Sequence, residues 1–136
     1  MSGKNVLAVG AHPDDVEILC PGTLVKLVKA GHRVTVAHVI NGDVGHYFIP
    51  AKELAEIRER GAAEAAQVIG AASIGFGFHY FGVYDDWDTL NKFADVIRQM
   101  KPDVIITHGP DDYLLEHIKV GQITIAACYE AGCPNI

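Results

Sequence analysis

The first residues able to do chemistry together lie in a short turn near the start of the chain. His12 and Asp15 are three positions apart and follow an apolar run at Val6–Val9, after Gly10 and Ala11. An imidazole nitrogen and a carboxylate oxygen at this spacing can point at one place, and both are ordinary zinc ligands. Asp14 lies between them and could act as a general base on a water molecule. Two protein ligands are too few for such a metal site, so a third must come from elsewhere in the chain.

The elements around this turn bear on whether it is chemical or structural. A simpler interpretation is that Asp14 or Asp15 caps the helix that follows. Val6–Val9 is apolar on both faces, which is typical of a strand in a parallel sheet covered on both sides. Pro13 directs the residue before it away from helical geometry. The carboxyl end of such a strand is where open α/β sheets bind their ligands.

The segment AHPDDVE at residues 11–17 resembles the signature of the LmbE-like, or PIG-L, family of zinc-dependent N-acetylglucosaminyl deacetylases. The resemblance implies that His12 and Asp15 bind zinc, with another divalent metal as an alternative. It implies that Asp14 activates a water molecule, which removes the acetyl group from an N-acetylated amino sugar or sugar conjugate. The expected enzyme is therefore a metal-dependent N-deacetylase that hydrolyses a linear amide and not a peptide bond.

The resemblance places the third metal ligand after a buried strand predicted at Val104–Thr107. Family members carry Asp-x-His-Pro-Asp-His in this region, and the last histidine corresponds to His117. Leu114 stands where the family has its earlier histidine, which stabilises the oxyanion or acts as an acid. Losing one such donor typically lowers the rate by about two to three orders of magnitude. The alternative function is therefore a zinc- and sugar-binding domain with impaired catalysis, and the alternative for His117 is a helix residue packed locally.

Other residues of the same segment could compensate for this departure. Glu116 keeps a carboxylate that could orient His117 from outside the ligand set. Tyr113 or His108 could supply the hydrogen-bond donor that Leu114 lacks.

The resemblance also implies three substrate contacts in other loops. Arg58 lies near the start of a helix predicted at Ala51–Ile69, where the family carries an arginine that reaches the substrate. Asp43 lies in a Gly-acidic-x-Gly loop, and Asp85 falls at the position of a loop aspartate of the family. Each residue also has a structural alternative. Arg58 could be a solvated helix arginine, and Asp43 could lie in a glycine turn without a function. The loop of Asp85 could serve only to cap the next helix through Asp86 or Asp88.

Predicted strands and helices alternate along the chain. Strands are expected at Val6–Val9, Arg33–Ile40, Ser73–Phe81 and Val104–Thr107. Helices are expected at Thr23–Ala30, Ala51–Ile69, Thr89–Met100 and Ile118–Ala131. This order predicts an α/β fold with a Rossmann-like parallel sheet flanked by helices. We expect residues 1–136 to form one domain, and the resemblance implies that it lacks the usual C-terminal portion of the family fold.

Composition limits the partners of the chain. The 136 residues are 49% hydrophobic, which fits a packed domain, and the net charge of −6 argues against nucleic acid or an anionic membrane as partner. No apolar run is long enough to span a membrane, and the first residues predict no signal peptide. The three cysteines have no metal-like spacing and indicate thiols in a reducing cytoplasm. The expected partner is a small N-acetylated sugar. A homo-oligomer is a further expectation, because core residues would be exposed where the family's C-terminal portion is missing.

Overall fold

A computed structural model describes residues 3–134 of the chain. Within this range four strands form one sheet, and every pair of neighbouring strands is parallel. The strands are β1 (Asn5–Gly10), β2 (Arg33–Ile40), β3 (Ala72–Phe78) and β4 (Val104–Thr107). Their order across the sheet is β3-β2-β1-β4, which puts β1 between β2 and β4. The predicted α/β fold with a Rossmann-like parallel sheet is confirmed.

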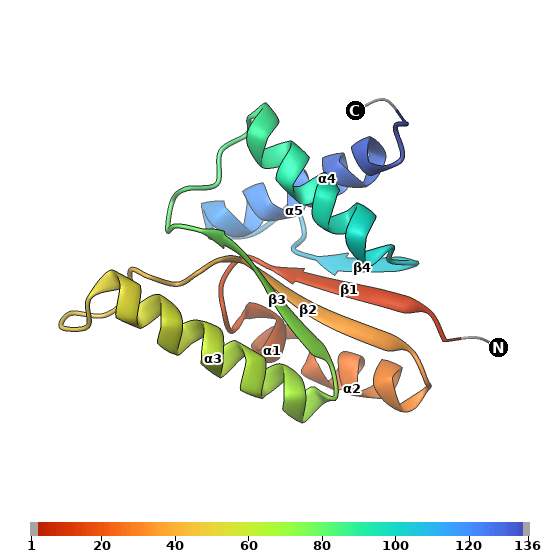
Figure 1. Ribbon diagram of the computed structural model, residues 1–136, viewed down its shortest axis with the longest axis horizontal. Helices are drawn as coiled ribbons and strands as arrows, with labels where there is room; N and C mark the ends of the chain where they lie inside the picture. Colours follow the sequence, from red (N-terminus) through yellow and green to blue (C-terminus); the bar gives the residue numbers. More distant parts are fainter. Residues whose placement is uncertain (1–2, 135–136) are drawn as a thin grey trace.

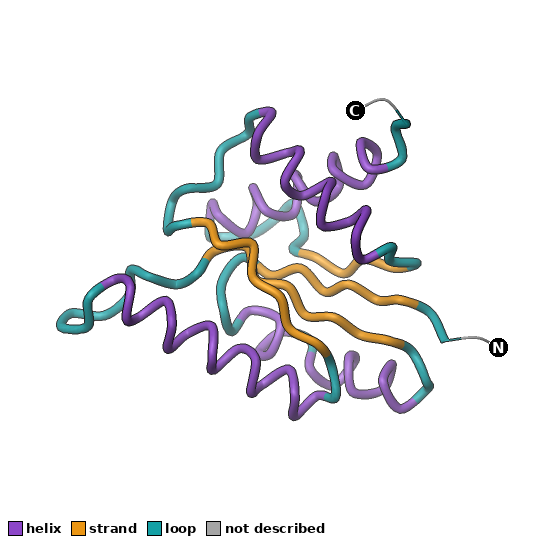
Figure 2. Tube along the Cα trace, in the orientation of Figure 1, coloured by secondary structure: helices purple, strands orange, loops and turns teal. Residues whose placement is uncertain are grey.

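Helices cover both faces of the sheet. The described residues form α1 (Asp15–Leu19), α2 (Pro21–Lys29), α3 (Ala51–Ile69), α4 (Trp87–Met100) and α5 (Leu115–Ala131). In Figure 1, α1, α2 and α3 lie on one side of the sheet and α4 and α5 lie on the other. Figure 2 shows the strands as a layer between these two groups of helices. Because all four strands run in the same direction, the loops at their carboxyl ends meet at one edge of the sheet.

The core is divided between the two faces by strand alternation. Leu7 and Val9 pack with Phe93 in the cluster under α4 and α5. Val6 and Ala8 point the opposite way and pack in the cluster under α1, α2 and α3. Successive side chains of a strand point to opposite faces, so a strand covered on both faces is apolar throughout. The prediction that this run is covered on both sides is confirmed.

Element boundaries differ from the prediction at several places, and the differences at α2 and β3 have a physical reason. The first helical segment was expected to begin near Thr23, but Pro21 begins α2, and a separate short helix, α1, precedes it. Proline is tolerated at the first position of a helix because the N–H that it lacks would have no partner inside the helix. β3 ends at Phe78, before the expected Phe81, whose backbone takes a left-handed φ of 56°. That conformation does not continue a strand.

Two further observations concern the surroundings of the protein. Across residues 3–134, no helix combines the length and the apolar character that crossing a membrane requires. Cys20, Cys128 and Cys133 are free thiols.

Candidate metal centre

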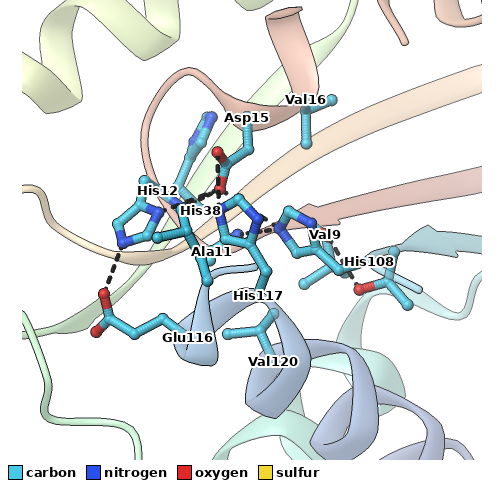
Figure 3. A network of polar contacts seen from close by, with 12 residues as sticks. Val9, Ala11, His12, Asp15, Val16, His38, His108, Glu116, His117 and Val120 are labelled. Carbon is cyan, nitrogen blue, oxygen red and sulfur yellow. Dashed lines mark hydrogen bonds and ion pairs between the residues drawn. The ribbon is translucent and has the colours of Figure 1, made fainter. Parts of the chain in front are cut away.

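The candidate metal ligands gather where β1 and β4 end. His12 follows β1, Asp15 begins α1, and His117 lies in the first turn of α5, which begins at Leu115 and not at Ile118 as predicted. Figure 3 shows the side chains of His12, Asp15 and His117 directed toward one another. One possible ligand atom from each of the three lies within 4.8 Å of the others. The fold thus brings together the three residues that the sequence singled out.

The turn between β1 and α1 is closed by local hydrogen bonds. The backbone N–H of His12 donates to Asp15 Oδ2 over 2.7 Å, and its ring Nδ1 lies 3.3 Å from the same oxygen. The backbone N–H of Asp14 donates to the carbonyl oxygen of His12 over 2.9 Å. Asp15 Oδ1 lies 3.2 Å from His117 Nε2. Its Oδ2 also lies 3.4 Å from His108 Nε2, so the Asp15 carboxylate is held among three imidazole rings.

The donor set fits a divalent cation. His117 Nε2 is buried and has no hydrogen-bond partner in the described part of the chain, although Asp15 Oδ1 faces it. A buried polar atom without a partner is costly, and a cation between the imidazole and the carboxylate would satisfy it. Two imidazole nitrogens and one carboxylate are also the donor types of a catalytic zinc site that keeps its fourth position open.

Each histidine of the set is oriented by a carboxylate on its other ring nitrogen. Asp112 Oδ2 lies 2.9 Å from His117 Nδ1, and Glu116 Oε2 lies 2.8 Å from His12 Nε2. The expectation that Glu116 orients His117 is wrong. Adjacent residues of a helix do not face each other, so Glu116 points away from the ring of the next residue and reaches the end of β1. Its Oε1 accepts a hydrogen bond from the backbone N–H of Phe81 over 2.7 Å.

These contacts set the ionisation of the site. Burial alone would raise the pKa of Asp15, but the imidazoles of His108 and His12 and the backbone N–H of His12 hold it well below its ordinary value. Burial alone would lower the pKa of His12, but Asp15 and Glu116 outweigh burial and raise it. Asp15 is therefore ionised at neutral pH, and a cation bound here would compete with a proton on His12.

Asp14 lies beside the ligand set but makes different contacts. Its Oδ2 accepts a hydrogen bond from Arg58 Nη2 over 2.9 Å, and both side chains are partly exposed. If Asp14 capped α1, its side chain would accept a hydrogen bond from the first turn of that helix. Within residues 3–134 it makes no such bond. Gly42 has a φ of 71°, and a Cβ there would lie 3.0 Å from Arg58 Nε. A glycine at this position leaves room for the arginine to reach Asp14, a pairing that the sequence did not predict.

Asp43 is more buried than a free substrate contact would be. Its side chain is 8% exposed, Oδ2 lies 2.7 Å from His79 Nδ1, and Oδ1 accepts a hydrogen bond from the backbone N–H of Tyr80 over 3.1 Å. Burial alone would raise the pKa of Asp43, but these two partners lower it. A direct contact with substrate would have to replace one of them.

Asp85 lies on the exposed loop that precedes α4. Its side chain makes no hydrogen bond or ion pair with any residue between 3 and 134, so it is free to meet a ligand. The neighbouring Asp86 caps α4, because its Oδ1 accepts a hydrogen bond from the backbone N–H of Thr89 over 2.8 Å. The capping role at α4 thus belongs to Asp86 and not to Asp85.

His108 belongs to the same cluster, although the sequence suggested it only as a replacement donor. Its ring stacks on that of His117 with centroids 4.0 Å apart, and its Nε2 meets the backbone N–H of Ala11 over 2.9 Å. A second possible metal set, His108 with Asp112 and His117, is less favourable because these contacts already occupy His108 Nε2 and His117 Nδ1. The signal for His108 was its place directly after β4, at the edge where parallel sheets bind ligands.

The geometry defines a class of protein: an α/β domain with a candidate histidine and aspartate metal site at the carboxyl edge of its parallel sheet. Residues 7–128 match the family model described as PIG-L: GlcNAc-PI de-N-acetylase. The chain belongs to this family, and the resemblance recognised in the sequence is confirmed.

Relatives within the family carry more than one activity in their names. The chain is 28% identical to 1D-myo-inositol 2-acetamido-2-deoxy-alpha-D-glucopyranoside deacetylase of Corynebacterium glutamicum, over 96% of this chain and 54% of the relative. It is 25% identical to 4-oxalmesaconate hydratase of Pseudomonas putida, over 84% and 47%. The solved N,N'-diacetylchitobiose deacetylase of Pyrococcus horikoshii superposes with a TM-score of 0.91 at 24% identity, over 97% and 52%. The chain thus spans about half the length of the relatives that it matches.

Proposed function

We propose that this chain carries the metal and base residues of a zinc-dependent N-deacetylase. The enzyme would remove the acetyl group from an N-acetylated amino sugar or sugar conjugate, with His12, Asp15 and His117 as the metal ligands. The observation that supports this most directly is the buried His117 Nε2, which faces Asp15 and has no hydrogen bond within residues 3–134. The Corynebacterium glutamicum relative, whose name describes deacetylation of an acetamido sugar, supports the substrate class.

The residues around the site have separable tasks in such a reaction. A divalent cation supplies Lewis-acid polarisation of the amide carbonyl when it is bound. Asp14 accepts a proton from the attacking water and passes it to the leaving amine. Arg58 binds Asp14 Oδ2, so Oδ1 is the oxygen left for the proton. Glu116 holds the ring of His12 in orientation.

The substrate contacts follow from exposure at the same edge. The side chain of Arg58 is 36% exposed beside Asp14, which suits a contact to a sugar hydroxyl near the reacting amide. Asp85 is exposed and unpaired within the described chain, and it would bind a second hydroxyl. Asp43 would reach the substrate only after His79 moves aside, and the 81% exposure of the His79 side chain permits that movement.

Leu114 favours a second candidate function, a zinc- and sugar-binding domain with impaired catalysis. Its backbone N–H donates to Asp112 Oδ1 over 2.9 Å, but its side chain has no donor for a developing oxyanion. Tyr113 offers a hydroxyl on the same loop, and its ring centroid lies 6.4 Å from that of His117. This candidate predicts metal and sugar binding without acetate release.

The test is to incubate zinc-loaded protein with a panel of N-acetylated amino sugars and conjugates and to measure free amine. We expect release by the native chain and none by Asp14→Ala, with one zinc per chain in both. Loss of zinc from Asp14→Ala would show that the roles of base and ligand are assigned wrongly.

Two further arms separate the alternatives. Zinc and sugar binding without amine release would favour the impaired domain, and Leu114→His should then raise the rate by about 100-fold or more. An unsaturated oxo acid tests addition of water, the chemistry in the name of the Pseudomonas putida relative. If the protein hydrated that acid and released no amine from any sugar, a hydratase function would replace the proposed deacetylase function.

A further inference from the structure

His79 is one of two exposed histidines among the seven of the chain, and its side chain is 81% exposed. The other is His46, in the loop between β2 and α3. His79 directly follows β3, at the carboxyl edge of the sheet, where parallel sheets bind ligands. The tasks given above to the site residues do not use its ring. An exposed imidazole at this edge therefore calls for its own explanation.

A buried carboxylate holds the ring of His79 from one side. His79 Nδ1 lies 2.7 Å from Asp43 Oδ2, and the side chain of Asp43 is 8% exposed. Asp43 Oδ1 accepts a hydrogen bond from the backbone N–H of Tyr80 over 3.1 Å. Burial alone would raise the pKa of Asp43, but His79 and this N–H lower it, so the carboxyl group is ionised at neutral pH. An ionised carboxylate can only accept hydrogen bonds, so His79 Nδ1 is the donor.

The direction of this bond leaves the other ring nitrogen of His79 free to accept. Nε2 has no hydrogen-bond partner within residues 3–134, and in the neutral ring it carries the lone pair. His46 has the opposite arrangement, because its Nδ1 accepts the backbone N–H groups of Phe48 and Ile49 over 3.2 and 3.1 Å. The neutral ring of His46 therefore carries its proton on Nε2. Of the two exposed histidines, His79 is the one with a solvent-facing acceptor.

The backbone of His79 is held as firmly as its ring. The N–H of Gly82 donates to the carbonyl oxygen of His79 over 2.9 Å. A Cβ at Gly82 would lie 2.9 Å from the same oxygen, so a side chain there would crowd the turn. Fixing an exposed side chain costs conformational entropy, and an exposed ion pair returns little stability. A ring fixed at both ends is instead typical of a side chain oriented for a ligand.

The loop of Asp43 connects this histidine and aspartate pair to the candidate base. Asp43 directly follows Gly42, where a Cβ would lie 3.0 Å from Arg58 Nε. Arg58 in turn binds Asp14 over 2.9 Å. The buried end of the pair therefore lies beside the residues that meet the reacting amide in the proposed reaction.

The turn of His79 connects the pair to a candidate metal ligand. The ring centroid of Tyr80, the next residue, lies 5.6 Å from that of His12. Phe81 donates its N–H to Glu116, which orients His12. Figure 1 shows the ends of β1, β2 and β3 side by side at this edge. A sugar held at the metal centre and extending toward the ends of β2 and β3 would therefore meet His79.

We propose that His79 binds a hydroxyl group of the substrate through Nε2, and that Asp43 is the positioning residue that orients its ring. The hydroxyl donates to Nε2 while Nδ1 donates to Asp43. Asp43 then acts from its buried position, and His79 need not move aside. This inference rests on the proposed function, because the hydroxyl belongs to the amino sugar whose amide would be hydrolysed at the metal centre.

Two amide substitutions separate the two ends of the ring. An asparagine amide reaches about as far as Nδ1 of a histidine, and a glutamine amide reaches about as far as Nε2. His79→Asn should therefore keep the bond to Asp43, and with it the native stability, but lose the bond to the sugar. Its KM for amine release should rise about fivefold at nearly unchanged kcat, as expected for one hydrogen bond of binding. His79→Gln should recover part of the affinity, and the matched control His46→Asn should keep the native KM.

Deoxy sugars identify the hydroxyl that His79 binds. With native protein, one of the 3-, 4- and 6-deoxy analogues of methyl N-acetylglucosaminide should have a KM about fivefold above that of the parent sugar. With His79→Asn the same analogue should show no further loss, because the substitution and the deoxygenation remove the same hydrogen bond. Additive losses for all three analogues would overturn the proposal. A KM below the native value for His79→Ala would also overturn it, since the uncovered Asp43 would then be the contact.

Chemical modification tests the contact without turnover. Diethyl pyrocarbonate acylates the imidazole nitrogen that carries the lone pair, so His79 should react faster than His46, and bound sugar should protect it in peptide mass spectrometry. Protection of His79, with weaker sugar binding by His79→Asn in calorimetry but no amine release, would contradict the proposed deacetylase and support the sugar contact. Amine release with a native KM for His79→Asn and no protection would leave the deacetylase standing and overturn this inference. If no sugar bound at all, both would be overturned.

Discussion

The turn that follows β1 and the loops that surround it hold their polar groups in different ways. Inside the turn, His12 N–H and the Asp15 carboxylate are three residues apart, and a 2.7 Å hydrogen bond joins them. Around the turn, Glu116 meets His12 from 104 positions away, and Arg58 meets Asp14 from 44 positions away. The first contact follows from spacing along the chain. The others require the sheet order that places β1 between β2 and β4.

The residues that supply the chemistry of the site thus differ from the residues that orient them. The contiguous residues of the turn supply a metal ligand pair and a candidate base, which is why a short sequence pattern identified them. The surrounding loops decide which carboxylate holds which imidazole, and there the expectation for Glu116 was wrong. Substitutions inside the turn should therefore lower metal affinity most, and substitutions in the surrounding loops should lower it less.

The largest effect is expected from Asp15→Asn. The variant keeps the shape of the side chain but removes the charge that lies between His12 and His117. Zinc affinity should fall by more than about 100-fold, beyond the usual effect of an orienting carboxylate. Competition with a chromophoric chelator measures this. Asp14→Asn is the matched control and should keep its zinc; an equal loss in both variants would refute the separation of ligand from base.

A smaller effect is expected from the orienting carboxylates. Glu116→Gln and Asp112→Asn should each weaken zinc binding by about 10- to 100-fold. Each carboxylate also binds one backbone N–H, so the loss should be greater for Glu116, whose side chain is 7% exposed, than for Asp112, which is 19% exposed. Asp111→Asn, at an exposed neighbouring position, is the control. If Asp111→Asn weakened zinc binding as much, the effect would be one of net charge.

Gly42→Ala tests the loop through which Arg58 reaches Asp14. The left-handed φ of Gly42 and the closeness of Arg58 Nε should lower the free energy of unfolding by roughly 1–2 kcal/mol. Gly45→Ala in the same loop is the control, since a Cβ there meets no described atom within 4 Å. Urea denaturation compares the two variants. Equal stabilities would show that the loop adapts without strain.

The smallest effect concerns Asp43 and depends on pH. The pKa of Asp43 is lower in the folded protein than in the unfolded chain, so its ionised form stabilises the fold above the unfolded value near 4. This contribution is lost as the pH falls through the folded value. The stability advantage of native protein over Asp43→Asn should therefore shrink between about pH 6 and about pH 3. It should stay under about 1 kcal/mol because the partner His79 is exposed.

Urea unfolding curves at several pH values provide the measurement. Asp85→Asn is the control because Asp85 is exposed and has no partner within residues 3–134. A stability difference for Asp43→Asn that grew on acidification would have the wrong sign and would refute the assignment.

Local patterns in the sequence determined the strands and the principal site residues. The apolar run of β1 predicted a buried strand, and the turn after it predicted which side chains stand at its end. The resemblance to the family selected His117, which the fold brings within 4.8 Å of the first pair, measured between possible ligand atoms. The strands and the turn depend on backbone geometry and strand alternation, which act over a few residues and are readable from one chain.

Tertiary structure alone decided the partners of those residues. Glu116 pairs with His12 because helix geometry turns it away from His117, and Arg58 reaches Asp14 because Gly42 leaves room for it. A space of about 590 Å³ opens where Ser73, Gly75 and Gly77 of β3 face alanines of α3, although neither segment alone predicts a space. Such features depend on how segments that are far apart in the sequence pack against one another. The spacing of residues along the chain does not specify that packing.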